Sequence, residues 1–89
     1  MVRPKKKTLL VTYDEAVGRV VKRCRRAAGV NQQEMAEALD ITPSALSRIE
    51  SGKVPLTCAR LKSFADRLEL SPKLLIEMIE AEFESPWWY

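Results

Sequence analysis

The segment Gly29–Gly52 constrains the fold most, because it holds two short helices separated by a turn of about three residues. Asn31 is a suitable N-cap for the first helix, and Glu34 three residues later completes a capping box. Thr42 caps the second helix, and Pro43 takes its first position, where a missing backbone amide costs nothing. The segment therefore predicts two helices joined by a tight turn.

The outward face of the second helix is small and polar, whereas Leu46 and Ile49 face inward. Small side chains allow a helix to approach base edges closely, and arginine has the fork geometry for a bidentate contact to guanine. This composition is typical of a helix-turn-helix, whose second helix enters the major groove of DNA by its N-terminal end. The outward residues are Pro43, Ser44, Ser47, Arg48 and Ser51. The alternative role of Arg48 is a phosphate contact, and the alternative for Ser44 and Ser47 is plain solvation.

Cap residues and apolar spacing predict three further helices around this pair. Thr12 and Glu15 form a capping box that begins a helix ending near Gly29, and Thr57 caps a fourth. A fifth begins at Ser71-Pro72 and ends at Ser85-Pro86. The fold class expected is all-α, with five helices and the helix-turn-helix at the second and third. We divide the chain into a basic arm at 1–11, a domain at 12–84 and an aromatic tail at 85–89.

Charge is spread unevenly along the 89 residues, although the net value is only +3. Residues 1–30 carry nine basic and two acidic side chains, whereas residues 69–89 carry Lys73 against five glutamates. A basic front and an acidic back favour a polyanionic partner, with ordinary solvated faces as the alternative. The outward face of the first helix is expected to carry Arg19, Lys22, Arg23, Arg25 and Arg26. We expect at most one or two of Arg23, Arg25 and Arg26 to contact a phosphate, because these three span too much of the helix circumference.

Several classes of protein are excluded by composition. The chain has no histidine, and its three glycines form no phosphate-binding loop, so we do not expect an enzyme. Cys24 and Cys58 lie far apart among apolar residues, and we expect both to be buried, with no metal and no cofactor. No apolar run approaches the ~20 residues of a membrane span, and no secretory segment follows the basic start. The expected location is the cytoplasm.

The gapless spacing from Gly29 to Gly52 resembles the Xre/Cro/phage-repressor class of helix-turn-helix domains. The pattern of that class is Gly-x-Ser-Gln-x-x-Leu-Ala-x-x-Leu-Gly-Val-Ser-x-x-x-Ile-Ser-x-Ile-Glu-x-Gly. Asn31, Met35, Ile41, Thr42 and Leu46 are like-for-like replacements, and the resemblance covers about residues 14–71. It implies a lambda-repressor-like domain. The residues that match outright are Gly29, Gln32, Ala36, Leu39, Ser47, Ile49, Glu50 and Gly52.

The resemblance also implies roles for individual residues. Gln32 would contact a phosphate and brace the recognition helix, and Glu50 would be structural, bonding to the neighbouring helix. The residues expected to contact bases are Pro43, Ser44, Ser47 and Arg48. Those expected to contact phosphates are Asn31, Gln32, Thr42, Ser51 and Lys53, together with Lys5, Lys6 and Lys7 of the arm. The arm's alternative role is that of a solubility tail.

Two residues depart from the pattern of the class. Asp40 replaces the usual turn glycine, and aspartate tolerates positive φ better than most residues. Pro43 replaces the frequent Gln or Ser, so it offers no donor and only apolar contact, such as to a thymine methyl group.

Half of the six aromatic residues lie in the tail, as Trp87, Trp88 and Tyr89. The tail is expected to fold back onto the core, to lie in a subunit interface, or to dock a different protein. We predict a homodimer, because the fifth helix is the usual dimer element of the class. The predicted interface consists of Leu75, Met78, Ile79, Phe83, Trp87 and Trp88.

The expected function is sequence-specific binding of double-stranded DNA by a small transcriptional regulator, acting as a repressor on a near-palindromic operator. A phage-type repressor, a restriction–modification controller and a general regulator all fit the sequence. The alternative is an antitoxin that binds a toxin through its C-terminal region. An RNA-binding module is less favoured, because no aromatic platform for stacking bases occurs outside the tail.

Overall fold

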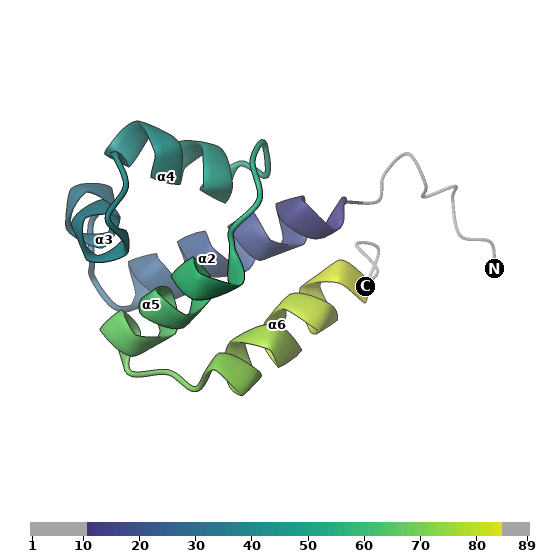
Figure 1. Cartoon of the computed structure of the whole chain (residues 1–89). Coiled ribbons are helices and arrows are strands. Elements are labelled where there is room, and N and C mark those ends of the chain that lie inside the picture. Colours follow the sequence, from purple (N-terminus) through teal and green to yellow (C-terminus); the bar gives the residue numbers. More distant parts are fainter. Residues whose placement is uncertain (1–10, 85–89) are drawn as a thin grey trace, which may run out of the picture.

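Residues 11–84 are described by the computed structural model, and within this range the chain forms five α-helices and no strand (Figure 1). None of these helices has the length and apolar content required to cross a membrane. The predicted all-α, five-helix fold is confirmed. The helices are α2 (Tyr13–Ala27), α3 (Gln32–Leu39), α4 (Pro43–Glu50), α5 (Cys58–Leu68) and α6 (Pro72–Glu84).

The helix starts lie where the cap residues place them. The Thr12 hydroxyl accepts from the Glu15 amide at 3.0 Å, and the Glu15 carboxylate accepts from the Thr12 amide at 2.9 Å. The hydroxyl of Thr57 likewise accepts from the third amide of α5. A capping oxygen satisfies an amide that has no partner within the helix, so each cap fixes where its helix begins.

A single core lies between the helices, and every helix contributes to it. α2 runs through the middle of the molecule and packs against both α4 and α6, while α5 closes the core against α3 and α6 (Figure 1). The apolar stripes predicted from three- and four-residue spacing point inward. The largest fully buried side chains are Val20, Val21, Met35, Leu46, Phe64, Leu75 and Ile79.

The approach of α2 to α4 depends on Gly18, which lies in the middle of α2. A Cβ atom at this position would lie 2.5 Å from the carbonyl oxygen of Glu50 and closer still to that of Ile49. Because backbone oxygens cannot move aside as a side chain can, only glycine allows the two helices to lie this close. Gly18 therefore sets the position of α4 on α2.

The two cysteines differ in their surroundings. Cys24 is buried in the core, and burial raises the pKa of its thiol. Cys58 is exposed, so the prediction that both are buried is wrong for Cys58. Cys58 lies on the same side of α5 as the buried Ala65, but it is the first residue of the helix, so its exposure reflects its place at the helix end and not its helical face.

Candidate nucleic-acid interface

The outer surface of α4 is the candidate reading surface. Pro43, Ser44, Ser47 and Arg48 are all exposed, as predicted, on one continuous face. The opposite side of α4 is held in the core by Leu46 and Ile49. The structure therefore brings the four predicted base-contacting residues together on a helix whose other face is fixed.

The turn before α4 depends on positive φ at Asp40. Asp40 adopts the left-handed conformation, with φ 59° and ψ 45°, and its amide donates back to α3. The next amide, that of Ile41, donates to the carbonyl of Ala36 at 2.9 Å, which closes the turn. Aspartate is one of the few residues besides glycine that visits this conformation regularly. The turn is therefore intact, although Asp40 stands where the class usually has glycine.

Two residues predicted to contact phosphates also serve as caps. The side-chain oxygen of Asn31 accepts from the Glu34 amide at 2.8 Å, and that of Thr42 accepts from the Ala45 amide at 3.0 Å. Both residues are exposed, at the starts of α3 and α4. The side-chain Nδ2 of Asn31 and the hydroxyl hydrogen of Thr42 remain as donors, beside helix ends that attract anions.

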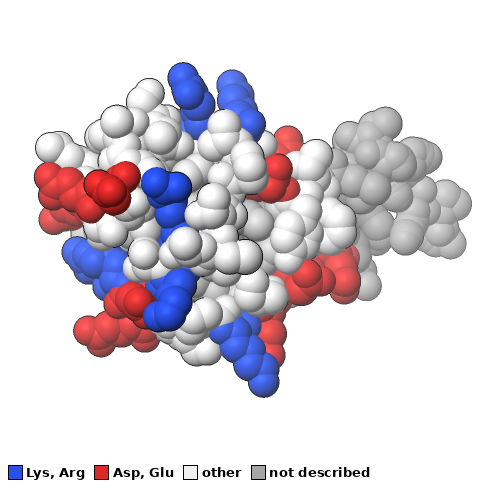
Figure 2. Space-filling model, in the orientation of Figure 1, with Lys and Arg blue, Asp and Glu red and all other residues white. Residues whose placement is uncertain are grey.

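The far end of α4 carries the remaining predicted phosphate contacts of the domain. Ser51 and Lys53 are exposed, and the Ser51 hydroxyl donates to the Arg48 carbonyl at 3.1 Å. Figure 2 shows uncharged and basic side chains along the upper edge formed by α4 and the loop after it, while acidic side chains lie beside and below this edge. On the face shown in Figure 2, the charged side chains along this edge are therefore basic.

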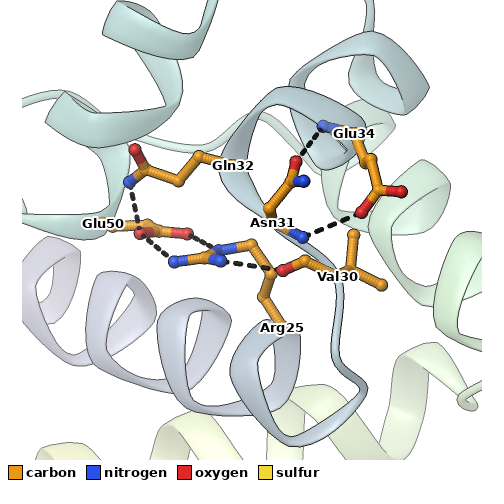
Figure 3. A network of polar contacts seen from close by, with 6 residues as sticks. All are labelled: Arg25, Val30, Asn31, Gln32, Glu34 and Glu50. Atoms are coloured by element: carbon orange, nitrogen blue, oxygen red, sulfur yellow. Dashed lines mark hydrogen bonds and ion pairs between the residues drawn. The ribbon is translucent and has the colours of Figure 1, made fainter.

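A buried network fixes the end of α4 to its neighbours (Figure 3). The Arg25 guanidinium of α2 donates to both carboxylate oxygens of Glu50, from Nε at 2.7 Å and from Nη2 at 3.2 Å. Its Nη1 atom donates to the Val30 carbonyl at 2.8 Å, and Nε2 of Gln32 donates to Glu50 at 2.9 Å. The predicted structural role of Glu50 and the bracing role of Gln32 are both confirmed.

The sequence predicts Arg25 on the exposed face of α2, together with its basic neighbours. This prediction is wrong, because the side chain of Arg25 points into the protein. Its side chain is only 8% exposed, because it follows Gly18 by seven residues and so lies on the side of α2 that faces α4. The signal was present in the sequence. Glu50 was expected to bond across to another helix, and an arginine on the Gly18 side of α2 is the partner that such a carboxylate requires.

The predicted dimer interface needs correction. Leu75 and Ile79 are 0% and 1% exposed within one chain, so they offer no surface to a second copy. They lie on the side of α6 that packs into the core, and Met78 is partly buried against the same core. Of the predicted set that the structure describes, only Phe83 is exposed.

Phe83 joins the end of α6 to the start of α2. Its ring meets that of Tyr13 edge to face, with centroids 5.1 Å apart. The Tyr13 hydroxyl donates to a carboxylate oxygen of Glu80 at 2.6 Å, and this bond to an anion raises the pKa of Tyr13 above 10.0. The two chain ends of the domain are therefore held side by side.

The remaining predicted residues lie outside the described range. They are Lys5, Lys6 and Lys7 of the basic arm and Trp87 and Trp88 of the tail.

Comparison with known proteins supports the geometry. A family model described as "Helix-turn-helix domain" matches residues 16–77. The clp gene regulator ClgR from Corynebacterium glutamicum is 26% identical, with a TM-score of 0.78 over 82% of this chain and 78% of that one. No curated protein sequence matches the chain.

A second similar protein is the restriction–modification controller protein C.Esp1396I. The wild-type structure is 25% identical, with a TM-score of 0.73 over 84% of this chain and 96% of that one. The same controller has been crystallised as a tetramer in complex with its natural 35 base-pair operator, and that chain has a TM-score of 0.71 at 26% identity, over 82% of this chain and 96% of that one.

Proposed function

The chain belongs to the helix-turn-helix domain family, and from that premise we propose that it is a transcriptional regulator that binds double-stranded DNA in a sequence-specific manner. The observation that carries the proposal is the outer face of α4. Its exposed residues are small or basic, and the buried pair of Arg25 and Glu50 fixes the helix from behind. A rigid helix with small side chains at its N-terminal end suits the major groove.

Arg48 is the residue to which we assign the most discriminating contact. A bidentate contact between its guanidinium and a guanine contributes about 1–3 kcal/mol of discrimination against a wrong base. The side chain is exposed one turn beyond Ser44. Pro43 and Ser44, at the start of α4, would adjoin bases through apolar contact and a hydroxyl group.

The test is selection of bound duplexes from a random-sequence library, followed by fluorescence anisotropy on the enriched sequence. We expect one enriched motif, and we expect Arg48→Ala to lose the preference at one base pair. Arg67→Ala is the control, because Arg67 is exposed on α5, away from α4. A library that returns no enriched motif, or an enriched motif indifferent to Arg48, contradicts sequence-specific reading.

We further propose that the regulator is a homodimer that represses from a near-palindromic operator, with half-sites about 34 Å apart. The support is the set of exposed apolar side chains on α6, and the operator-bound tetramer of C.Esp1396I. Ile76 and Phe83, each 40% exposed, lie on one side of α6, whereas the exposed Leu74 lies on the other side. Ile76 and Phe83 replace Leu75 and Ile79 as the interface residues of the proposal.

Sedimentation of the wild type and of Ile76→Glu tests the dimer. We expect this variant to be monomeric at concentrations where the wild type is dimeric, and Leu74→Glu, exposed on the other side of the same helix, to remain dimeric. A wild-type chain that sediments as a monomer at micromolar concentration contradicts this part of the proposal.

In this proposal the chain acts in the cytoplasm, by binding alone, with neither catalysis nor a cofactor. The support is compositional. A chain without histidine lacks the commonest general base and the commonest metal ligand.

A further inference from the structure

The outer face of α2 carries a basic stripe, which we define as Arg19, Lys22, Arg23 and Arg26. Each of the four residues lies three residues from one other member and four residues from another, so they share one face of the helix. All four are exposed, and together they line a shallow, open depression. The stripe is therefore one continuous surface and not scattered charge.

The basic stripe points away from the contact between α2 and α4. Gly18 and Arg25 face α4, as their contacts with Glu50 show. Arg19 and Arg26 each follow one of these residues by a single position, which places them about 100° further around the helix. The stripe is thus distinct from the candidate reading surface, although the same helix supports both.

Only one carboxylate neutralises the stripe within the range that the structure describes. Glu82 of α6 accepts from Arg23 at 2.8 Å and lies 3.5 Å from Arg19. Both arginine side chains remain 56% exposed. Lys22 and Arg26 form no ion pair among residues 11–84, so the stripe keeps most of its positive charge.

The chemistry of the stripe favours phosphate. Three of its four members are arginines, whose planar forks match the oxygens of phosphate or carboxylate. Neighbouring positions at these steps lie about 5–6 Å apart, so successive cations can each meet a separate charge of an extended anion. Glu82 already occupies the stripe as an anion would, between two arginines.

We propose that the basic stripe of α2 is a second DNA-binding surface, which holds a phosphodiester backbone without reading its sequence, and that Glu82 limits its strength by competing for Arg19 and Arg23. This inference rests on the proposed function, because it takes DNA as the ligand. Its test uses random-sequence duplexes, so its failure is distinguishable from a failure of sequence-specific reading by Arg48.

The first test is Glu82→Gln, with Glu77→Gln as the matched control. Both variants remove one negative charge from α6, but Glu77 is exposed and lies outside any ion pair of the described residues. We expect Glu82→Gln to bind a random duplex several-fold more tightly, because Arg19 and Arg23 are released. The slope of log affinity against log salt should steepen by about 0.9 for each phosphate gained. A gain of affinity also cannot arise from a fold that has been damaged.

The second test removes charge from the stripe itself. We expect Lys22→Gln with Arg26→Gln to weaken binding to every duplex by the same factor and to reduce the salt slope by up to about 1.8. Arg67→Gln with Lys73→Gln removes the same charge from exposed positions on α5 and α6 and should have little effect. Circular dichroism checks that each variant remains folded.

Two duplex lengths identify where the backbone comes from. If the stripe variant binds a long duplex more weakly than the wild type does, but binds a short duplex equally well, the stripe contacts the flanks of the same DNA. Energy transfer between two labelled duplexes assigns it to a second one, and either result supports the proposal. The proposal is overturned if both stripe tests match their controls, in which case an acidic protein surface becomes the candidate ligand.

Discussion

Arg25 Nε lies 2.7 Å from Oε2 of Glu50, and the two side chains are 8% and 3% exposed. This ion pair joins the middle of the molecule to the last residue of the candidate recognition helix α4. Gln32, the first residue of α3, donates to the same carboxylate at 2.9 Å. Three helices thus meet at one buried charge, so the orientation of α4 depends on a contact that is remote from its reading face.

Removal of Arg25 should therefore be costly. We expect Arg25→Met to reduce the free energy of unfolding by about 3–5 kcal/mol, because Glu50 would remain buried without its cation. Urea unfolding followed by circular dichroism measures the loss.

The double variant Arg25→Met with Glu50→Leu is the control for this prediction. Replacing both charges with apolar groups removes the unpaired carboxylate, and we expect most of the lost stability to return. A double variant as unstable as the single one would contradict the role of the buried charge and assign the loss to packing alone.

Gly18→Ala should destabilise the protein, although alanine ordinarily stabilises a helix interior by about 0.5–1 kcal/mol. The added Cβ would collide with the carbonyl oxygens of Ile49 and Glu50. Overpacking of this kind costs about 1–3 kcal/mol, so the steric effect outweighs the gain in helix propensity. A variant with a higher urea midpoint than the wild type would show that α2 and α4 are not in close contact at Gly18.

Glycine should be stabilising at the two non-glycine positions that have positive φ among residues 11–84. Asp40 and Glu69 end α3 and α5 with φ values of 59° and 58°. A Cβ atom in this conformation costs about 1–2 kcal/mol, less for aspartate, while glycine gives up part of the gain through greater freedom in the unfolded chain. We expect Glu69→Gly to raise the unfolding free energy by up to about 1 kcal/mol and Asp40→Gly by less. The reverse order in urea titrations would refute the assignment of strain.

The free energy of unfolding should fall at acidic pH, because Glu82 loses its charge there. Its hydrogen bonds and charge interaction with Arg23, and secondarily with Arg19, outweigh partial burial and lower the pKa of Glu82 below its ordinary 4.5. A carboxyl with a lowered pKa in the folded state stabilises the fold above its ordinary pKa, and this contribution is lost as the pH falls through the folded-state pKa.

Urea midpoints of the wild type and Glu82→Gln, compared from about pH 3 to pH 7, measure this contribution. We expect the difference between the two proteins to be largest near neutrality and to shrink below about pH 4.5. Glu77→Gln should run parallel to the wild type. If Glu82→Gln also runs parallel, the ion pair contributes nothing to stability in solution.

Lys53 and Arg48 should differ in what they contribute to DNA binding. Both are exposed at the end of α4, but only Arg48 lies on its outward helical face. We expect Lys53→Gln to weaken binding about equally on all sequences and to reduce the salt slope by about 1, as the loss of a phosphate contact does. Arg48→Ala should instead relax the preference at one base pair. Anisotropy on enriched and scrambled duplexes separates the two effects.

Local signals account for most of what the sequence determined. Caps act within one turn, so Thr12, Asn31, Thr42 and Thr57 place the helix starts without any tertiary partner. The spacing of apolar residues likewise fixes the inward side of α4, and with it the exposed face that carries Pro43, Ser44, Ser47 and Arg48. The fold class and the candidate reading surface follow from these short-range effects.

Only the tertiary structure decided which side chains near the edge of a buried face turn inward. Arg25 enters the core because α4 lies against Gly18 and offers Glu50, whereas Cys58 stays outside. On α6, Leu75 and Ile79 are buried while Leu74 and Ile76 remain exposed, although all four residues are apolar. The apolar surface of α6 is larger than the area that the neighbouring helices can cover. More than one side of such a helix could be buried, and the packing of the other helices selects one.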